Sequence, residues 1–213
     1  FTMGYMGFRS KTLDDKKRMI IIRKKRRQWN IKDADFWRKY LISKKILITF
    51  AVEPISHYWV NANRFSCKTI TYSFKFNNRY KIYSPLDNKN KWLSNTKKTD
   101  IQGYKQLPPI GEKVYLTSSL KDVICLYAAG YNAVALQSEM QMPDERLISN
   151  LENKFKKIIV LYDNDIPGQD MANKICDKYD LENVFVPIES DCKDQSDWVE
   201  KEGKFNKLKF LLK

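Results

Sequence analysis

Two aspartates of the chain are spaced to bind a cation together. The run Ile158 to Asp170, IIVLYDNDIPGQD, is apolar and β-branched until it reaches Asp163 and Asp165. Residues two apart in a strand point to the same side, so these carboxylates converge while Asn164 points away. Carboxylate oxygens suit Mg²⁺ or Mn²⁺ better than zinc. The alternative is an ordinary loop between a strand and a helix, because Asp, Asn and Gly are common turn residues.

A second pair of acids follows the next predicted strand. The stretch CKDQSDWVE, Cys192 to Glu200, places Asp194 and Asp197 after the strand predicted at Val184 to Pro187. Ligands bind at the carboxyl ends of the strands in open α/β sheets. We therefore expect all four carboxylates to face one place.

The second half of the chain alternates strands with helices. Apolar runs and turn residues predict strands at 113–117, 132–136, 158–162 and 184–187, and helices at 119–129, 144–156 and 168–179. Gly130 follows the first of these helices at the position where a left-handed residue ends a helix. This alternation implies a parallel sheet with right-handed crossovers.

The first half of the chain has a different pattern and is separated from the second by Leu107–Gly111 (LPPIG). It predicts a mixed α/β subdomain, with a turn at Asn77-Asn78, a helix at 34–40 and strands at 48–52, 57–60, 70–76 and 80–83. We accordingly divide the chain into a basic segment (1–30), a mixed α/β subdomain (31–110) and a parallel-sheet domain with a carboxy-terminal helix (111–213).

The charge of the chain favours a polyanionic partner. Lys and Arg number 39 against 25 Asp and Glu, a net charge of +14. The run Lys16 to Trp29 concentrates this charge, and we expect it to add sequence-independent affinity for nucleic acid, with Arg23, Lys24, Lys25, Arg26 and Arg27 as binding residues. A solvated helix or tail is the alternative. A membrane helix is disfavoured because the apolar part spans only Met19 to Ile22.

Several kinds of catalytic and binding site are disfavoured because the residues that they require are missing from the sequence. His57 is the only histidine and lies in an aromatic strand pattern, so serine and cysteine triads have no base. The four cysteines show no CxxC spacing, and no GxxxxGK[ST] loop is present. The chain has no secretory segment and no apolar run that could span a bilayer, from which we expect an intracellular, cytoplasmic protein without a membrane partner.

The order of these motifs resembles the TOPRIM domain of DnaG-type and of phage or Twinkle-like primases. Upstream, Phe36 to Asn61, KIYSP (Lys81 to Pro85) and Lys91 to Pro108 look like the first half of a phage primase polymerase domain, so the resemblance covers roughly 35–200. It implies a TOPRIM domain at 111–213, RNA primer synthesis on single-stranded DNA from NTPs, and a replicative helicase partner. TOPRIM folds also serve nucleases and topoisomerases, so a nuclease is an alternative.

The resemblance also implies roles for individual residues. Asp163, Asp165 and Asp194, assisted by Asp197, would hold Mg²⁺ or Mn²⁺. Asp122 would orient Lys121, which could contact a phosphate. The wall opposite the TOPRIM sheet would contribute cations for template and nucleotides, namely Lys81, Lys89 and Lys91.

One departure from the family pattern affects the acid–base chemistry. The family's first motif is E-G-x-x-D, but this chain reads SSLKD, with Ser118 at the Glu position and Asp122 retained. A hydroxyl is no general base near neutral pH. The chain could be a degenerate single-stranded-DNA-binding module, or the carboxylate could come from Glu139, which follows the next strand. The alternative for Glu139 is a solvated loop acid.

The beginning and the composition of the chain add two expectations. It opens on Phe1, from which we expect an excised polymerase core or one whose zinc module and helicase are separate proteins. Its many Lys and Asn residues suggest an AT-rich genome, as in a phage, and hence the host cytoplasm.

Overall fold

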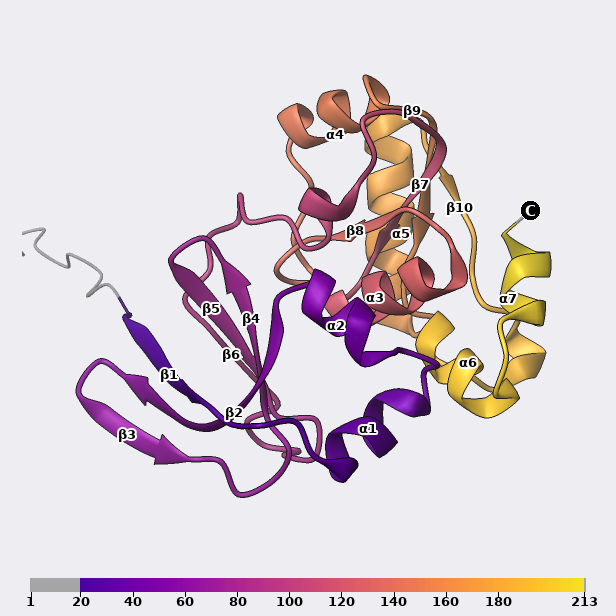
Figure 1. The fold of residues 1–213 in the computed structure, drawn as a ribbon. Helices are drawn as coiled ribbons and strands as arrows, with labels where there is room; N and C mark the ends of the chain where they lie inside the picture. Colours follow the sequence, from indigo (N-terminus) through magenta and orange to yellow (C-terminus); the bar gives the residue numbers. More distant parts are fainter. Residues whose placement is uncertain (1–19, 213) are drawn as a thin grey trace, which may run out of the picture.

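The computed structural model describes residues 20–212, which form two sheets with helices between and around them (Figure 1). Lys16, Lys17 and Arg18 of the basic run lie outside the described residues. The mixed α/β class expected from the sequence is confirmed: an antiparallel sheet in the first half and a parallel sheet in the second. None of the helices in residues 20–212 combines the length and the apolar character that a membrane crossing needs.

The antiparallel sheet has the order β1-β2-β4-β5-β6, with β3 paired to β2. Its strands are β1 (Ile22–Arg26), β2 (Val52–Val60), β3 (Asn63–Ser66), β4 (Tyr72–Phe76), β5 (Arg79–Tyr83) and β6 (Trp92–Ser94). The predicted turn at Asn77-Asn78 joins β4 to β5, and Asn77 adopts a φ of 54°, a conformation that asparagine tolerates. The basic run therefore contributes a strand, β1, rather than a solvated helix.

Two helices lie between β1 and β2 in the chain. They are α1 (Ile31–Arg38) and α2 (Lys44–Thr49), so the strand predicted at 48–52 is wrong. The β-branched run ILIT suggested a strand, but Ser43 caps a helix there by accepting a hydrogen bond from the Ile46 amide at 3.4 Å. Leu47 is buried in the core on that helix, and this packing overrides the local preference.

The second sheet has the order β10-β9-β7-β8, and every pairing in it is parallel. Its strands are β7 (Gly111–Thr117), β8 (Ala133–Ala135), β9 (Phe155–Leu161) and β10 (Glu182–Asn183). The helices are α3 (Leu120–Ala129), α4 (Glu145–Glu152), α5 (Ile166–Tyr179), α6 (Gln195–Glu202) and α7 (Asn206–Leu211), with single 3₁₀ turns at Tyr104–Gln106 and Ile188–Ser190. The predicted alternation of strands and helices is confirmed.

Several of the predicted boundaries shift in the structure. The helix expected at 144–156 ends at Glu152, because Phe155 already pairs with Gly111 in the sheet. The helix expected from Gly168 begins at Ile166, where Asp165 caps it. The last strand lies at Glu182–Asn183 rather than at 184–187.

One hydrophobic core joins the two sheets. Buried side chains of the first half, such as Trp37 and Tyr72, belong to the same cluster as Ile124 and Trp198 of the second half. The two halves therefore pack against one another through this shared core. The packing fixes the position of one sheet relative to the other. The division of the chain at Leu107–Gly111 stays a prediction.

A buried ion pair anchors β1 to this core. Asp33, with no exposed side-chain surface, accepts hydrogen bonds from Nη1 and Nη2 of Arg27 at 2.6 and 2.7 Å. The Tyr72 hydroxyl and the Asn30 amide donate to it at 3.0 and 2.9 Å. Burial raises the pKa of Asp33, but the hydrogen bonds from Arg27, Asn30 and Tyr72 outweigh it and the pKa lies below 3.8.

Breaking this pair is expected to destabilise the fold. Arg27→Gln leaves a buried carboxylate without its counter-charge, a loss of about 3 kcal/mol in the free energy of unfolding. Because the folded-state pKa of Asp33 is depressed, the pair's contribution is fully present above pH 3.8 and falls as the pH drops through the folded value. Urea unfolding at pH 7 and below pH 3.8 measures both effects. An equal loss for the exposed-pair control Arg38→Gln would contradict this assignment.

Candidate metal and nucleotide site

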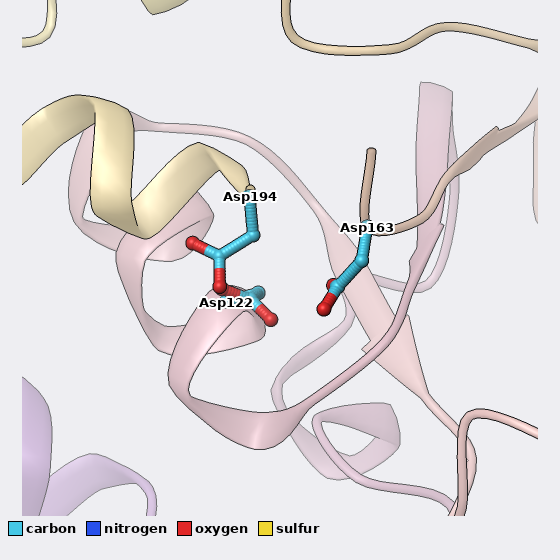
Figure 2. A group of neighbouring side chains, drawn as sticks. All are labelled: Asp122, Asp163 and Asp194. Atoms are coloured by element: carbon cyan, nitrogen blue, oxygen red, sulfur yellow. The ribbon is translucent and has the colours of Figure 1, made fainter. Parts of the chain in front are cut away.

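Three aspartates from separate elements converge at the carboxyl edge of the parallel sheet (Figure 2). Asp122 lies on α3, Asp163 follows β9 and Asp194 precedes α6. One carboxylate oxygen from each lies within 4.8 Å of the others, and all three residues are buried. We call this cluster the acidic triad.

Helix caps place two members of the acidic triad. Ser119 caps α3, and its hydroxyl donates to Oδ2 of Asp122, in the first turn, at 2.6 Å. Asp194 caps α6 by accepting a hydrogen bond from the Asp197 amide at 2.7 Å. Both arrangements are local, and Ser or Asp at such positions satisfies amide groups that a helix leaves free.

Ser196 links Asp122 to Asp194. Its hydroxyl lies 2.6 Å from Oδ1 of each carboxylate. A hydroxyl carries one hydrogen, so it can donate to one carboxylate only, and the other contact needs a proton or a cation. Burial, and then the charge of Asp194, raise the pKa of Asp122 well above its ordinary value. Asp122 and Asp194 therefore lie close enough for their negative charges to repel one another.

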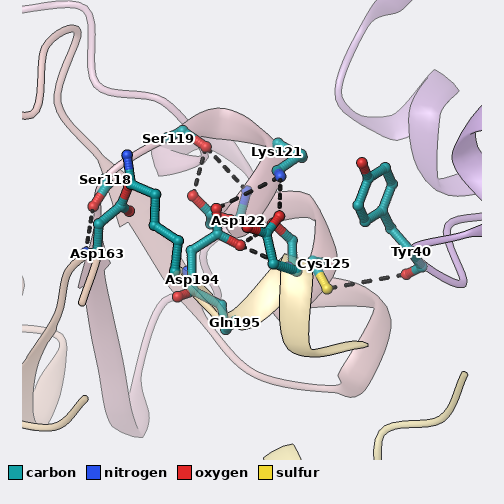
Figure 3. A network of polar contacts seen from close by, with 12 residues as sticks. Tyr40, Ser118, Ser119, Lys121, Asp122, Cys125, Asp163, Asp194 and Gln195 are labelled. Atoms are coloured by element: carbon teal, nitrogen blue, oxygen red, sulfur yellow. Dashed lines mark hydrogen bonds and ion pairs between the residues drawn. The ribbon is translucent and has the colours of Figure 1, made fainter. Parts of the chain in front are cut away.

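Asp163 connects the acidic triad with Ser118 (Figure 3) and also with Lys193. Its amide donates to Oγ of Ser118 at 3.1 Å, and its Oδ2 lies 2.9 Å from Nζ of Lys193. Burial raises the pKa of Asp163, and the ammonium of Lys193 opposes that shift. Ser118 thus orients the backbone of a triad member.

Asp165 and Asp197 lie outside the triad. Asp165 caps α5 through the Gly168 amide at 2.9 Å and pairs with Lys193 at 2.9 Å. Burial raises its pKa, but Lys193 and the Gly168 amide lower it by more. Asp197 pairs with Lys121 at 3.2 Å, while burial and then Asp194 raise its pKa.

The acidic triad forms one wall of a cleft of about 560 Å³ between the two sheets. The opposite wall comes from β5 and β6 and carries Lys81, Tyr83 and Trp92. The Tyr83 and Trp92 rings stack at 4.2 Å, and Nζ of Lys81 lies 4.9 Å from the centre of the Trp92 ring. A cationic and aromatic wall therefore faces an acidic one.

Two lysines of the cleft are held in place by their surroundings. Lys81 is buried and donates to the Gln137 carbonyl at 2.9 Å, and burial lowers its pKa to about 8. Lys121 lies 3.6 Å from Asp194 and 4.8 Å from the centre of the Tyr40 ring. Burial lowers the pKa of Lys121, but Asp194, Asp122 and Asp197 raise it by more, so its charge persists.

Glu139 lines the same cleft, next to Ser118 and Asp163. Burial, and then the charge of Asp163, raise its pKa, whereas Lys193 and the Ser118 hydroxyl lower it. Its Oε1 is buried and has no hydrogen-bond partner among the described residues. An acid with an unpartnered buried oxygen beside other carboxylates differs from a solvated loop acid.

The structure brings most of the expected site residues together. The cleft is lined by Asp122, Asp163, Asp194, Asp197, Glu139, Lys81, Lys91 and Lys121. Asp165 lies next to it through Lys193, whereas Lys89 and the β1 cations Arg23 to Arg27 are not among the lining residues. The residues that sequence reasoning missed are Lys193, Ser196 and Trp92. The sequence did offer one signal for Lys193, which is its position directly before Asp194.

The donor set fits a hard divalent cation. Three buried carboxylates lie within 4.8 Å of one another, the single hydrogen of the Ser196 hydroxyl cannot serve both of its carboxylate neighbours, and Oε1 of Glu139 is buried without a partner among the described residues. Oxygen donors of this kind are the ligands that Mg²⁺ and Mn²⁺ prefer. The acidic triad is thus a candidate divalent-cation site.

Gly168 allows the Asp163 loop to close on α5. A Cβ at this position would overlap the Asp163 carbonyl oxygen and lie 3.0 Å from the Asp163 Cβ. We expect Gly168→Ala to displace Asp163, lower the melting temperature by several degrees and weaken Mn²⁺ binding by about tenfold. Calorimetry measures both. The matched control Gly203→Ala, at a helix end with open space around it, is expected to leave Mn²⁺ binding unchanged.

Comparison with known proteins identifies the second half of the chain. Residues 112–187 match the Toprim domain family, so the chain contains a Toprim domain. This segment holds Asp122, Asp163 and Glu139, whereas Asp194 follows it. The comparison with curated proteins found no match.

Solved structures share the fold of nearly the whole chain. The DnaG catalytic core has a TM-score of 0.67 and 16% identity, over 85% of this chain and 72% of that one. The DnaG primase catalytic domain bound to ssDNA has a TM-score of 0.65 and 17% identity, over 85% and 71%. The primase fragment of the bacteriophage T7 primase-helicase protein gives 0.58 and 17%, over 89% and 80%. The antiparallel sheet is therefore part of the shared fold.

Proposed function

Because the chain contains a Toprim domain within the fold of DnaG-type primase catalytic cores, we propose that it is a primase polymerase core. It would synthesise short RNA primers on single-stranded DNA by divalent-cation-dependent nucleotidyl transfer. The observation that carries this proposal is the cleft itself: a buried acidic triad faces lysines and a stacked aromatic pair across about 560 Å³. Such a cleft offers contacts to the charges and to the base of a nucleotide.

The acidic triad holds the cation in this proposal. Asp122, Asp163 and Asp194 would supply oxygen ligands to Mg²⁺ or Mn²⁺, with Asp165 and Asp197 at its edge. The bound ion would lower the pKa of the attacking 3′-hydroxyl and offset charge on the phosphates. Ser119 and Ser196 would hold the carboxylates through the hydrogen bonds described above, and Ser118 would hold the Asp163 backbone by accepting from its amide.

The lysines of the cleft would bind phosphates. Lys121 keeps its positive charge between Asp194 and Asp197, and Lys91 and Lys81 lie on the opposite wall. The Trp92 ring, 38% exposed, offers a face on which a base can stack. Glu139 would supply the carboxylate that the family places at the position of Ser118, as a proton acceptor or as a cation ligand.

The partners we propose are those of a primase. The DnaG domain of similar fold was solved with ssDNA, and the T7 primase fragment comes from a primase-helicase protein. We infer that this chain takes a single-stranded DNA template and NTPs and acts with a replicative helicase. The Toprim nuclease and the non-catalytic DNA-binding module are the competing functions, and Ser118 favours the latter.

One incubation separates the three functions. The protein is mixed with single-stranded DNA, radiolabelled NTPs and Mg²⁺ or Mn²⁺, and the products are resolved on a denaturing gel. New RNA primers are expected. Shortened DNA would establish the nuclease instead, and unchanged DNA with a shifted band on a native gel would establish the binding module.

The charge of Lys81 is expected to give nucleotide binding a pH dependence. Since burial lowers its pKa to about 8, Lys81 loses its charge as the pH rises through that value, and NTP affinity should fall by up to about tenfold between pH 7 and pH 9. Fluorescent-nucleotide titration measures it. Lys81→Arg, which stays charged, should flatten the profile, and an unchanged profile would exclude Lys81 as the titrating group.

A further inference from the structure

One ammonium group lies between the two aspartates that follow β9. Nζ of Lys193 is 2.9 Å from Oδ2 of Asp163 and 2.9 Å from Oδ2 of Asp165. Burial lowers the pKa of Lys193, but its hydrogen bonds to both aspartates raise it by more, so Lys193 keeps its charge there. A side chain of the protein itself therefore fills the position that the spacing of these two carboxylates makes suitable for a cation.

The backbone around Lys193 holds this side chain beside the two aspartates. The Lys193 carbonyl accepts a hydrogen bond at 2.6 Å from the amide of Asn164, the residue between them. The side chain of Asn164 in turn donates to the Val186 carbonyl at 3.1 Å, and the next residue, Asp194, caps α6. An ordinary surface ion pair contributes little, partly because two long side chains must first be ordered. Lys193 differs because its backbone is already fixed next to both partners.

A second lysine contacts another member of the acidic triad. Nζ of Lys121 lies 3.6 Å from Asp194 and 3.2 Å from Asp197. Asp122 forms no ion pair within 4.0 Å among residues 20–212 and is held by two serine hydroxyls. Figure 2 shows the three triad carboxylates turned toward one common position. Two of them thus each contact an ammonium as well, whereas the third does not.

Asp163 contributes to two neighbouring positions for positive charge. It belongs to the acidic triad and also to the pair of carboxylates that holds Lys193. In a two-metal site these positions would hold two ions, about 3.5–4 Å apart. An ion at the second position would have to displace the Lys193 ammonium and draw its oxygens in from 2.9 Å to about 2.1 Å. Lys193 therefore competes with a second ion for the same two oxygens.

We propose that Lys193 occupies the second cation position of this centre and so makes it a single-cation site. The inference rests on the proposed function, because it assigns a role to a residue of the same site. One ion would bind among Asp122, Asp163 and Asp194, and Lys193 would supply the fixed charge that a second ion would otherwise bring to Asp163 and Asp165. Lys193 is then a positioning residue that sets the number of ions.

Counting the bound ions by titration calorimetry with Mn²⁺ tests the proposal. The wild type should bind a single ion. Lys193→Ala should bind a second one, at least about tenfold more tightly than the wild type does, because the competing positive charge is gone. Lys193→Arg keeps the charge and should still bind a single ion. An unchanged number of ions in a folded Lys193→Ala protein would overturn the proposal, and weaker NTP binding by that protein would make Lys193 a phosphate-binding residue instead.

The matched control is Lys157→Ala. The Lys157 side chain is 45% exposed, against 49% for Lys193, and it pairs with a single carboxylate, that of Glu182, at 2.7 Å. It does not line the cleft. Its removal should leave both the number of bound ions and their affinity as they are in the wild type. An extra ion in this control would attribute the effect to the lost surface charge and overturn the proposal.

Electron paramagnetic resonance shows where the second ion binds. Two Mn²⁺ ions about 3.5–4 Å apart are magnetically coupled, so Lys193→Ala should give a coupled spectrum and the wild type that of an isolated ion. Asp165→Asn in the Lys193→Ala background should abolish the second ion, because it removes one of the two oxygens that Lys193 contacts. An uncoupled second ion would lie elsewhere and would overturn the proposal.

These readouts do not depend on primer synthesis. One bound ion in both the wild type and Lys193→Ala would overturn the role of Lys193 and leave the proposed function standing. Absence of Mn²⁺ binding by the wild type would overturn the cation site itself, and this inference with it. The two failures are therefore distinguishable.

Discussion

Asp163→Asn is expected to reduce primer synthesis by about 10³-fold, equivalent to a loss of ~4 kcal/mol of transition-state stabilisation. The substitution keeps the shape of the side chain but removes an anionic oxygen from the acidic triad, whose oxygens lie within 4.8 Å of one another. Single-turnover primer synthesis at saturating NTP measures the loss. The fold should survive, because the Asp163 amide still donates to Ser118.

Direct binding of Mn²⁺ separates the role in binding from the role in activity. Titration calorimetry should show a sharp loss of affinity in the Asp163→Asn/Asp165→Asn double variant. Asp165→Asn alone is the matched control, since asparagine caps helices as well as aspartate does and Asp165 lies outside the triad. Its effect should be several times smaller. An unchanged Mn²⁺ affinity in the folded double variant would remove the metal-site hypothesis.

Glu139→Gln is expected to lower primer synthesis by about 10²-fold or more, the scale of losing a general acid–base group. Glu139 lies in the cleft beside Asp163, with a raised pKa and an unpartnered buried oxygen. Ser118→Ala, by contrast, removes one hydrogen bond to the Asp163 amide and should cost less than ~10-fold. The rate constants of primer synthesis by Glu139→Gln and by Ser118→Ala are compared. Their ratio tells which of the two residues supplies the acid–base function.

A rescue experiment makes this assignment sharper. Ser118 and Glu139 line the same cleft, so Ser118→Glu in the Glu139→Gln background returns a carboxylate to it, at the position that the sequence resemblance assigns to Glu. The double variant should recover at least part of the lost activity, while Ser118→Gln in that background should not. Near-wild-type synthesis by a folded Glu139→Gln protein would end the relocation hypothesis. Absence of primers from the unmodified protein with either cation, once any required zinc module and helicase are supplied, would favour the binding module.

The sequence by itself determined the elements that carry the site. The apolar runs before Thr117 and Asp163 predicted parallel strands, and both are present, with their carboxyl ends at one edge of the sheet. Ser119 and Asp194 cap the helices that follow. These features depend on local hydrogen bonds and on a general rule of sheet topology, so neighbouring residues suffice to predict them.

The tertiary structure alone decided which acids meet. Asp165 was expected to bind the cation together with Asp163; it caps α5 and meets Asp163 through Lys193, whereas Asp122 from α3 lies with Asp163 and Asp194 in the triad. A cap forms through the next turn of the same helix, whereas the triad needs three elements placed by one shared core. Nothing local to Asp122 or Asp165 encodes that difference.

The same physical reason explains the other differences. The segment around Ile48 is helical because Leu47, on the same helix, packs into the core that joins the sheets. Lys24 and Arg27 were expected to be free for nucleic acid, yet Glu53 and Asp33, which the sequence pattern does not connect with them, neutralise them. Charge and propensity are local properties of a chain. Which charges remain free, and which preferences prevail, is set by burial and by partners elsewhere in the fold.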